Sequence, residues 1–303
     1  MKRGWTRPLM SVAMAVAVTV TGTGCRRVSD ALLGGVDSNV TSVSMSIPQV
    51  DTQDNSVYRI FVSAVDQGGN PLVGLLMGNF SILENGGPGV PIDVSPVQEP
   101  LYVVLVIDRS GSMLGSRTTA ANTAAISLVN ALAPNDYAAL IEFSDTVNIT
   151  SGFISDKTAM ANFINAGVAN GSTAVYDATV EGAKLLLGVH GRRMLLVLTD
   201  GDDNSSKLTV SDTIKNVNDR GLSANMVGLG GDAGGTALAQ IASETGGVFA
   251  ESITGADLTT IYLNILSRYQ NLMAIRYRRR ESGKITAYLN YGNLTASASK
   301  QLD

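Results

Sequence analysis

The sequence predicts an α/β fold with a doubly wound, mostly parallel sheet that is inserted in or flanked by a small β-sandwich. Between residues 99 and 270, short apolar runs typical of strands buried on both faces alternate with stretches of helical periodicity. Residues 40–98 instead have a period of two and are divided by turns rich in glycine, asparagine and proline. The same period of two returns in residues 271–303. These observations place an α/β domain between two groups of β-strands.

The composition is that of a folded protein with a mildly acidic balance of charge. The chain has 303 residues, 45% of them hydrophobic, which is sufficient for a domain of ordinary size and a smaller one. It contains 22 lysine and arginine residues against 26 aspartate and glutamate residues. Three of the basic residues, Lys2, Arg3 and Arg7, lie at the N-terminus, so the rest of the chain is more acidic than the whole. We therefore expect no nucleic acid partner.

Residues 1–24 are predicted to be an export signal. After a basic start, Leu9–Val20 is an apolar segment that is too short to span a bilayer. The next residues, Thr21-Gly-Thr-Gly-Cys25, resemble the end of a bacterial lipoprotein signal, in which small residues precede the cysteine that is lipidated. The chain departs from that pattern at Gly22, where the family prefers leucine.

Cys25 is the only cysteine of the chain, so no intrachain disulfide can form. The resemblance implies that Cys25 becomes the lipidated N-terminus and anchors an exported protein in the bacterial cell envelope, at the outer membrane or facing the periplasm. Residues 25–39 are short, polar and glycine-containing, and we expect them to form a tether. The alternative is a soluble exported protein that an ordinary signal peptidase cleaves.

The first β-rich segment, residues 40–98, is expected to form a small β-sandwich. Val43 and Met45 alternate with serines, and further short strands follow at regular spacing. Pro71-Leu-Val-Gly-Leu75 and Asn79-Phe-Ser-Ile-Leu-Glu-Asn-Gly86 resemble parts of an immunoglobulin-like module found in some bacterial exported proteins. An irregular β-rich spacer is the alternative interpretation.

The last segment, residues 271–303, is expected to complete this sandwich. A hairpin alone is only marginally stable in water, so these strands need partners, and the α/β domain then becomes an insertion. Arg276, Arg278 and Arg280 lie on one side of the first of these strands. A solvated strand face is the simple interpretation, and a surface for an acidic partner or for lipid headgroups is the alternative.

Within the α/β domain, residues 99–270, strands and helices are expected to alternate along the chain. Glu99-Pro100 marks the start of the domain, and Gly221 ends one helix after a basic last turn. Strands are expected at residues 101–108, 137–143, 194–198, 224–229 and 248–251, with a short edge strand at 147–150. Helices are expected at residues 117–132, 157–166, 174–187, 211–220, 236–244 and 258–270.

An oxygen-rich loop follows the first buried strand of the α/β domain. The apolar run that begins at Leu101 ends at Asp108, and Ser110 and Ser112 follow at alternate positions, so all three side chains can point the same way. The loop lies at the carboxyl end of a buried strand, where open α/β sheets bind their ligands. Hard oxygen donors suit Mg²⁺ or Mn²⁺ and not zinc or copper.

This Asp-x-Ser-x-Ser motif resembles the metal-ion-dependent adhesion site of von Willebrand factor type A domains. That family's site also takes a threonine from a later loop, which matches the segment Asn170-Gly-Ser-Thr-Ala-Val-Tyr-Asp177. It takes an aspartate from the end of a central strand, which matches Met194-Leu-Leu-Val-Leu-Thr-Asp-Gly201. The resemblance implies that Mg²⁺, or alternatively Mn²⁺ or Ca²⁺, is held by Asp108, Ser110, Ser112, Thr173 and Asp200.

The resemblance implies a metal-dependent protein-binding or adhesion module that is displayed on the cell envelope. Because the site has few carboxylates, the positive charge of the cation is not fully neutralised, so a Glu or Asp side chain of a protein partner can supply a missing ligand. Two alternatives stay open: a metal that merely holds three loops together in a structural scaffold of an envelope complex, and an Asp-dependent phosphohydrolase. In the second, Asp108 would be the nucleophile, but such enzymes usually need a second carboxylate at the position of Ser110.

Two further motifs point elsewhere. Gly228-Leu-Gly-Gly-Asp-Ala233 has the setting of a dinucleotide fingerprint, but the sheet is nearly finished there and a glycine-rich helix entry suffices. Asp200-Gly-Asp-Asp-Asn204 resembles the start of a calcium loop, but the loop lacks glycine at its sixth position and glutamate at its twelfth. Asp202 and Asp203 are then expected to form an exposed acidic loop beside the metal.

Overall fold

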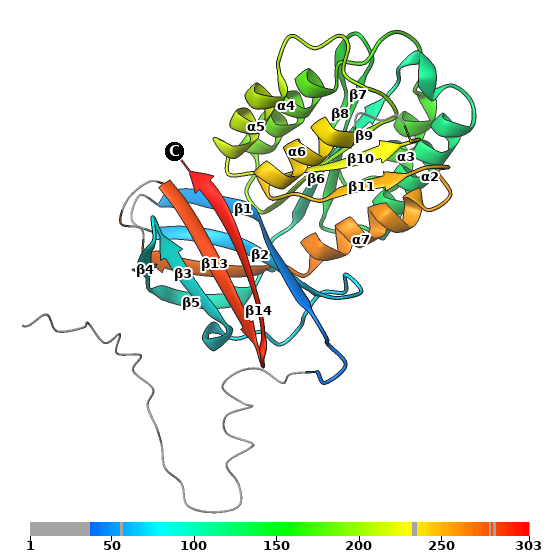
Figure 1. The fold of residues 1–303 in the computed structure, drawn as a ribbon. Helices are drawn as coiled ribbons and strands as arrows, with labels where there is room; N and C mark the ends of the chain where they lie inside the picture. The colour runs from blue at the N-terminus through cyan, green and yellow to red at the C-terminus, as the bar shows by residue number, and fades with distance from the viewer. Residues whose placement is uncertain (1–36, 55–56, 232–234, 279, 281–282, 303) are drawn as a thin grey trace, which may run out of the picture.

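The residues that the computed structural model describes are 37–54, 57–231, 235–278, 280 and 283–302 (Figure 1). The predicted export signal, the predicted lipidation site Cys25 and most of the predicted tether lie outside these residues. Within the described part of the chain, no helix is both long and apolar enough to cross a membrane.

A six-stranded sheet forms the centre of the α/β domain (Figure 1). Adjacent strands are parallel except at one edge, where the last strand is antiparallel to its neighbour. This sheet, covered by helices on both faces, confirms the predicted fold class. In spatial order its strands are β11 (Phe249–Ser252), β10 (Ala224–Leu229), β9 (Arg192–Thr199), β6 (Leu101–Asp108), β7 (Tyr137–Phe143) and β8 (Val147–Ile154).

The helices cover the two faces of this sheet in two groups of three. Side chains of β6 alternate between the faces: Val103 and Leu105 pack against the first group, whereas Val104 and Val106 pack against the second. This alternation explains why the strand is apolar without interruption. The first group is α2 (Ser116–Ala131), α3 (Lys157–Ala166) and α7 (Leu258–Gln270), and the second is α4 (Val175–Leu185), α5 (Val210–Asn218) and α6 (Gly235–Thr245).

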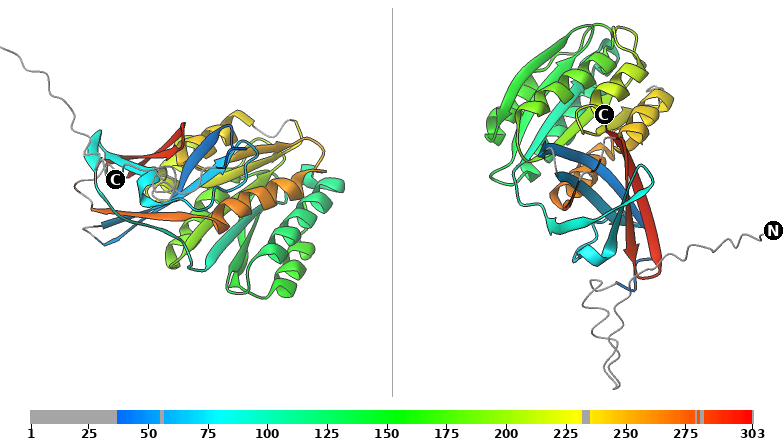
Figure 2. Two further views of the ribbon diagram at one scale, coloured as in Figure 1. Left: turned by 90° about the horizontal axis from the view of Figure 1, so that it is seen from below. Right: turned by 90° about the vertical axis from the view of Figure 1, so that its left-hand side faces the viewer.

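Two four-stranded antiparallel sheets pack face to face in a β-sandwich, shown in two further views in Figure 2. One sheet consists of β1 (Val43–Asp54), β2 (Val57–Asp66), β12 (Met273–Arg278) and β5 (Pro91–Pro96). The other consists of β14 (Leu294–Leu302), β13 (Gly283–Tyr291), β3 (Phe80–Glu84) and β4 (Gly87–Gly89). Short 3₁₀ helices in the connections are η1 (Met77–Asn79), η2 (Gly111–Met113) and η3 (Leu186–Gly188).

Both sheets of the sandwich combine strands from the two ends of the chain. Ile275 of β12 lies opposite Ile60 of β2, and Ala287 of β13 lies opposite Ile82 of β3. All four side chains are buried in one apolar cluster. Since β5 and β12 are neighbours, the chain enters and leaves the α/β domain at adjacent strands.

The sandwich contacts the amino end of the central sheet. The Val50 amide of β1 donates to the Gly221 carbonyl at 2.8 Å, and the Gln49 side chain accepts from the Arg193 amide at 2.8 Å. Gly221 has a φ of 64°, and a Cβ there would lie 2.3 Å from the Val50 carbonyl oxygen, so only glycine fits. The carboxyl ends of the parallel strands therefore lie on the side of the domain away from the sandwich.

Lys300 of β14 also reaches this junction. Its buried Nζ donates to the carbonyls of Leu222 and Thr245, the latter at 2.7 Å, and to the Ser223 hydroxyl at 3.3 Å. Burial, with a smaller contribution from the charge of Arg193, lowers the pKa of Lys300 to about 7. One side chain of the sandwich thus satisfies backbone acceptors of the α/β domain.

Candidate metal centre

The predicted site lies at the topological switch point of the central sheet. The chain runs from β6 outward to β7 and β8, and it then returns to β9 on the other side of β6. Asp108 ends β6 and Asp200 directly follows β9, and these strands are parallel neighbours in which Ile107 pairs with Leu198. Open α/β sheets bind ligands in the crevice that such a reversal creates.

Four of the five predicted donors form one hydrogen-bonded cluster. The Ser110 amide donates to Asp108 Oδ1 at 2.6 Å, and the Ser110 and Ser112 hydroxyls are 3.0 Å apart. The Ser112 hydroxyl donates to Asp200 Oδ1 at 2.7 Å. Three loops meet at this edge of the sheet: the first is residues 109–115, the second 167–174 and the third 200–209. Ser112, in the short helix η2, joins the first loop to the third through its bond to Asp200.

Thr173 borders this cluster and is held by the loops on either side. The Gly111 amide donates to the Gly171 carbonyl at 3.0 Å, which ties the first loop to the second. The Asn204 side chain accepts from the Thr173 amide at 2.8 Å, which ties the second loop to the third. A Cβ on Gly201 would lie 3.8 Å from the Thr173 hydroxyl oxygen. Among the described residues, no hydrogen bond joins that hydroxyl to the other four donors, so Thr173 is adjacent to the cluster and not part of it.

Asp108 is a completely buried carboxylate. It accepts from the Thr199 hydroxyl at 2.6 Å and from the Ser110 amide, yet burial raises its pKa against these hydrogen bonds, and the charge of Asp200 adds to the rise. No ion pair involves Asp108 in the part of the chain that the structure describes. A buried charge without a partner is costly, and a bound cation would remove that cost.

The donor set of this site fits a hard divalent cation. In the described part of the chain, no three His, Cys, Asp or Glu side chains gather into a group that could hold a metal ion. The site therefore depends on hydroxyl oxygens beside its two carboxylates. Mg²⁺ and Ca²⁺ accept such ligands and usually retain water as well, whereas a structural zinc site uses nitrogen and sulfur.

Two residues that were not predicted from the sequence act directly on the carboxylates. Thr199, one residue before Asp200, holds Asp108 from the neighbouring strand. Arg117, at the start of α2, places Nη1 2.5 Å from Asp200 Oδ2. Neither contact can be predicted from a local sequence pattern, because the two residues of each pair come from distant parts of the chain.

The interpretation of Asp203 as part of an exposed acidic loop is wrong. Asp203 is half-buried and accepts from the Tyr176 amide at 3.3 Å and from the Ser206 hydroxyl at 2.5 Å. Asp177 similarly accepts from the amides of Lys207 and Leu208, both at 3.0 Å. These carboxylates fix the third loop against α4, whereas Asp202 is exposed as expected.

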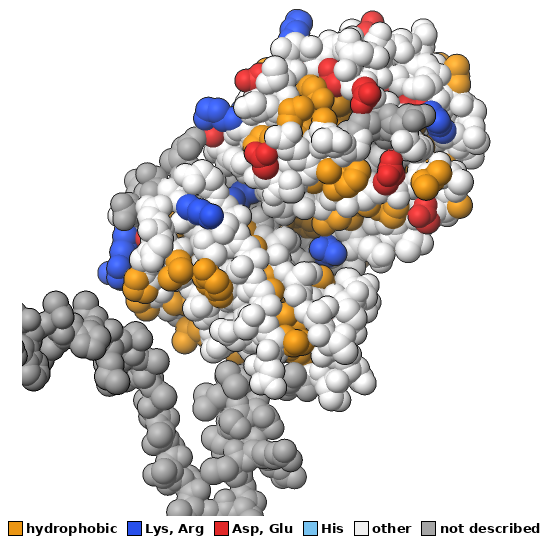
Figure 3. All heavy atoms as spheres, in the orientation of Figure 1, with side chains coloured by type: hydrophobic (Ala, Val, Ile, Leu, Met, Phe, Trp, Pro, Cys, Tyr) orange, Lys and Arg blue, Asp and Glu red, His pale blue; other side chains and the backbone are white. Residues whose placement is uncertain are grey.

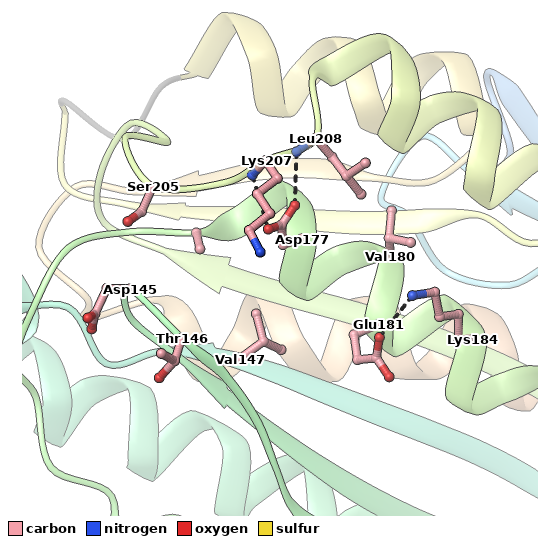
Figure 4. Close-up of a pocket in the computed structure, with 11 residues that line it drawn as sticks. Asp145, Thr146, Val147, Asp177, Val180, Glu181, Lys184, Ser205, Lys207 and Leu208 are labelled. Carbon is pink, nitrogen blue, oxygen red and sulfur yellow. Dashed lines mark hydrogen bonds and ion pairs between the residues drawn. The ribbon is translucent and has the colours of Figure 1, made fainter.

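A groove of about 530 Å³ lies beside the second and third loops (Figure 4). Asp145 and Lys207 face it from opposite sides, with the α4 residues Val180, Glu181 and Lys184 along its length. The ion pair between Glu181 and Lys184 spans 3.1 Å. The groove offers mixed charge and apolar surface next to Thr173. On the face shown in Figure 3, most acidic side chains lie over the α/β domain, whereas the charged side chains on the sandwich are mostly basic.

Fold and site together define a doubly wound α/β domain with an oxygen-donor cluster at its switch point. The model of the von Willebrand factor type A domain family matches residues 103–263, and the chain belongs to this family. Domains of this family are commonly metal-dependent protein-interaction modules.

Similar curated proteins are heavy chains of inter-alpha-trypsin inhibitor. The chain is 25% identical to heavy chain H4 of Bos taurus over 198 residues, which are 59% of this chain and 22% of that protein. It is 30% identical to heavy chain H6 of Homo sapiens over 165 residues, which are 48% of this chain and 13% of that protein. The chain thus spans less than a quarter of the length of these relatives.

Two solved structures share the fold at low identity. A von Willebrand factor type A protein from Catenulispora acidiphila has a TM-score of 0.54 at 12% identity, with 88% of this chain and 75% of that chain covered. This match extends beyond the α/β domain into the sandwich. Proximal thread matrix protein 1 from the mussel byssus, with a zinc-occupied MIDAS motif, has a TM-score of 0.52 at 19% identity, with 62% and 50% covered.

Proposed function

We propose that the protein is a metal-dependent protein-binding module in which a cation on the α/β domain receives a carboxylate from a protein partner. The observation that carries this proposal is the buried Asp108, which has no ion pair among the described residues and lies next to the hydroxyls of Ser110 and Ser112. These three residues would hold the cation directly. Thr173 and Asp200 would complete the protein's share, either directly or through water.

Mg²⁺ is the cation that we propose, with Mn²⁺ or Ca²⁺ as alternatives. The donors are carboxylate and hydroxyl oxygens, and cations of this kind prefer such ligands. The zinc-occupied MIDAS motif of the mussel protein makes Zn²⁺ a necessary comparison in any titration.

The partner would offer a Glu or Asp side chain. Asp108 and Asp200 are the only carboxylates among the five donors, and Asp200 already shares its charge with Arg117. A divalent cation held by these groups would keep positive charge for an incoming carboxylate. The mixed-charge groove that begins beside Thr173 would accommodate neighbouring residues of the partner.

A purely structural metal is a weaker explanation of the site. The three loops are already joined by contacts of the protein itself, between Gly111 and Gly171 and between Thr173 and Asn204. A cation is therefore not required to hold them together. An aspartyl-phosphate enzyme is weaker still, because Ser110 occupies the position of the second carboxylate and its hydroxyl contacts Ser112.

The proposed location is the bacterial cell envelope, with a lipid anchor on Cys25. We propose a separate α/β domain at residues 99–270 and a sandwich of residues 40–98 and 271–303. The first described residue, Asp37, donates its amide to the Tyr291 hydroxyl of the sandwich at 2.8 Å. Since the site lies at the far end of the sheet, an anchor on this side would leave the metal face directed away from the membrane.

Capture of partners from an envelope extract tests the proposed function. The full mature chain is immobilised and incubated in Mg²⁺ or in chelator, with Asp108→Ala and Asp202→Ala as further baits. Asp202 is exposed in the third loop and outside the cluster, so its variant is the matched control. We expect the same protein to be retained by wild type and by Asp202→Ala in Mg²⁺ only. Retention that survives both chelator and Asp108→Ala would contradict metal-dependent binding.

A further inference from the structure

We propose that Arg117 is a tethered cation that holds Asp200 when no metal is bound and competes with the divalent cation for this carboxylate. The inference rests on the proposed metal centre and adds to it a residue that the sequence motifs do not contain. Its consequence is an exchangeable metal, whose affinity depends on how readily the guanidinium releases Asp200.

Asp200 has both carboxylate oxygens engaged by the protein itself. Oδ1 accepts from the Ser112 hydroxyl at 2.7 Å, and Oδ2 accepts from Arg117 Nη1 at 2.5 Å. The Asp200 side chain is 0% exposed, whereas the Arg117 side chain is 42% exposed. A cation that uses Asp200 must therefore share a carboxylate that already has a positively charged partner, and that partner has a route to solvent.

The guanidinium occupies a slot that glycine provides. Gly230 follows β10 with a φ of 92°, and a Cβ at this position would lie 3.2 Å from Arg117 Nη2. The Arg117 guanidinium thus lies close to both the end of β10 and Asp200, and it contacts the carboxylate oxygen that Ser112 does not contact. A Cβ at position 230 would press against the guanidinium, and the positive φ favours glycine there in any case.

The position of Arg117 in its helix does not explain the pair. Arg117 is the second residue of α2, and a cation in a first turn is unfavourable with the helix dipole. No acidic residue of that turn offsets the charge. The ion pair with Asp200 compensates for this unfavourable placement.

Electrostatics predicts competition between the two cations. The Arg117 guanidinium carries a positive charge, and its Nη1 lies 2.5 Å from Asp200 Oδ2. A divalent cation beside Asp200 is repelled by this charge across a short distance in partly buried surroundings. Removal of the charge should therefore tighten Mg²⁺ binding, by roughly tenfold or more.

Calorimetric Mg²⁺ titration of Arg117→Met and Arg117→Gln tests the inference. Lys207→Met removes an exposed cation that lines the groove without contacting Asp200, and it serves as the control. We expect both Arg117 variants to bind Mg²⁺ about tenfold more tightly, and Lys207→Met to change the affinity by less than about twofold. In chelator, the Arg117 variants should melt below wild type, because Asp200 loses its partner.

A spectroscopic measurement on wild type keeps the test independent of the variants. The NMR signal of the Arg117 Nε–H should shift in step with added Mg²⁺ as the guanidinium leaves Asp200. An unshifted signal, or equal or weaker Mg²⁺ binding by the Arg117 variants, would show that the guanidinium only orients Asp200 and would overturn the inference. If the Arg117 variants bind Mg²⁺ and wild type does not, the competition between the two cations is upheld, but the proposed metal-dependent function of wild type is contradicted. Binding by neither would refute the inference and the proposed function together.

Discussion

Asp108 depends on one neighbouring hydroxyl for its position. Thr199, completely buried on the adjacent strand, donates to Asp108 Oδ2 at 2.6 Å, while the Ser110 amide donates to the other oxygen. These two donors direct the carboxylate toward the loop and moderate the rise of its pKa that burial causes. Residues that orient a metal ligand in this way commonly tune metal affinity without contacting the metal.

Thr199→Val is expected to weaken Mg²⁺ binding by about tenfold or more, because it removes a hydrogen bond that orients Asp108 while keeping the shape of the side chain. The loss of this bond should also lower the free energy of unfolding in chelator by about 1–3 kcal/mol. Thr213→Val is the matched control: Thr213 is completely buried, donates to the Thr209 carbonyl at 2.9 Å, and lies on α5. Calorimetry measures the Mg²⁺ affinity, and urea unfolding measures the stability. Equal Mg²⁺ affinities of wild type and Thr199→Val would contradict the role of Thr199.

Sequence alone could predict that Asp108, Ser110, Ser112 and Asp200 come together, because each lies in a local motif whose spacing is visible along the chain. It could not predict Arg117 or Thr199 as part of the site. Arg117 meets Asp200 across 83 positions, and Thr199 meets Asp108 across 91. Such contacts depend on strand order, which places β9 beside β6, and no spacing within the chain encodes them.

At the scale of elements, buried strands were the most predictable part of the fold. The uninterrupted apolar run of β6 follows from its contacts with helices on both faces. The edge strand β8 was predicted only for residues 147–150, whereas it extends to Ile154. Its pairing with β7 has register irregularities, and Ile149 is half exposed. The alternation of buried apolar and exposed polar residues, from which a strand is predicted, is therefore lost.

The third loop shows why acidic residues were harder to interpret than apolar ones. A carboxylate in a loop is predicted to be exposed unless its hydrogen-bond donors are known, and the Tyr176 amide that donates to Asp203 lies 27 positions away. Asp177 in turn accepts hydrogen bonds from two backbone amides that lie 30 and 31 positions later in the chain. These two residues hold α4 and the third loop together, so the site rests on contacts between loops that only the fold brings together.

At the scale of the whole molecule, Lys300 connects the sandwich to the α/β domain. Its Nζ has three acceptors at the amino end of the central sheet and no carboxylate partner among the described residues. The pKa of about 7, lowered by burial and by Arg193, means that the folded protein holds this proton less tightly than the unfolded chain does. Between about pH 7 and the ordinary lysine pKa near 10, the unfolded state binds more protons, so stability should rise with pH.

Lys300→Met should remove this pH dependence. We expect urea unfolding of wild type to show a free energy that increases from about pH 7 to about pH 9.5, with a smaller increase in the variant. At high pH the variant should be less stable by about 1–3 kcal/mol, because buried carbonyls lose their donor. Parallel curves for the two proteins would contradict a neutral Lys300 in the folded state, and unchanged Mg²⁺ affinity would confirm that the junction is separate from the metal face.

Calorimetric titration of the chelator-treated mature chain with Mg²⁺, beside Asp108→Ala and the control Asp202→Ala, tests the proposal that Asp108 holds a divalent cation. The proposal predicts one Mg²⁺ per chain for wild type and Asp202→Ala, with a Kd between about 1 μM and 1 mM, within the range known for oxygen-ligand Ca²⁺ sites. It predicts an affinity at least about 100-fold weaker for Asp108→Ala, which loses the buried charge that the cation would neutralise. No binding of Mg²⁺, Mn²⁺ or Ca²⁺ by wild type up to about 10 mM, or equal binding by Asp108→Ala, would contradict it.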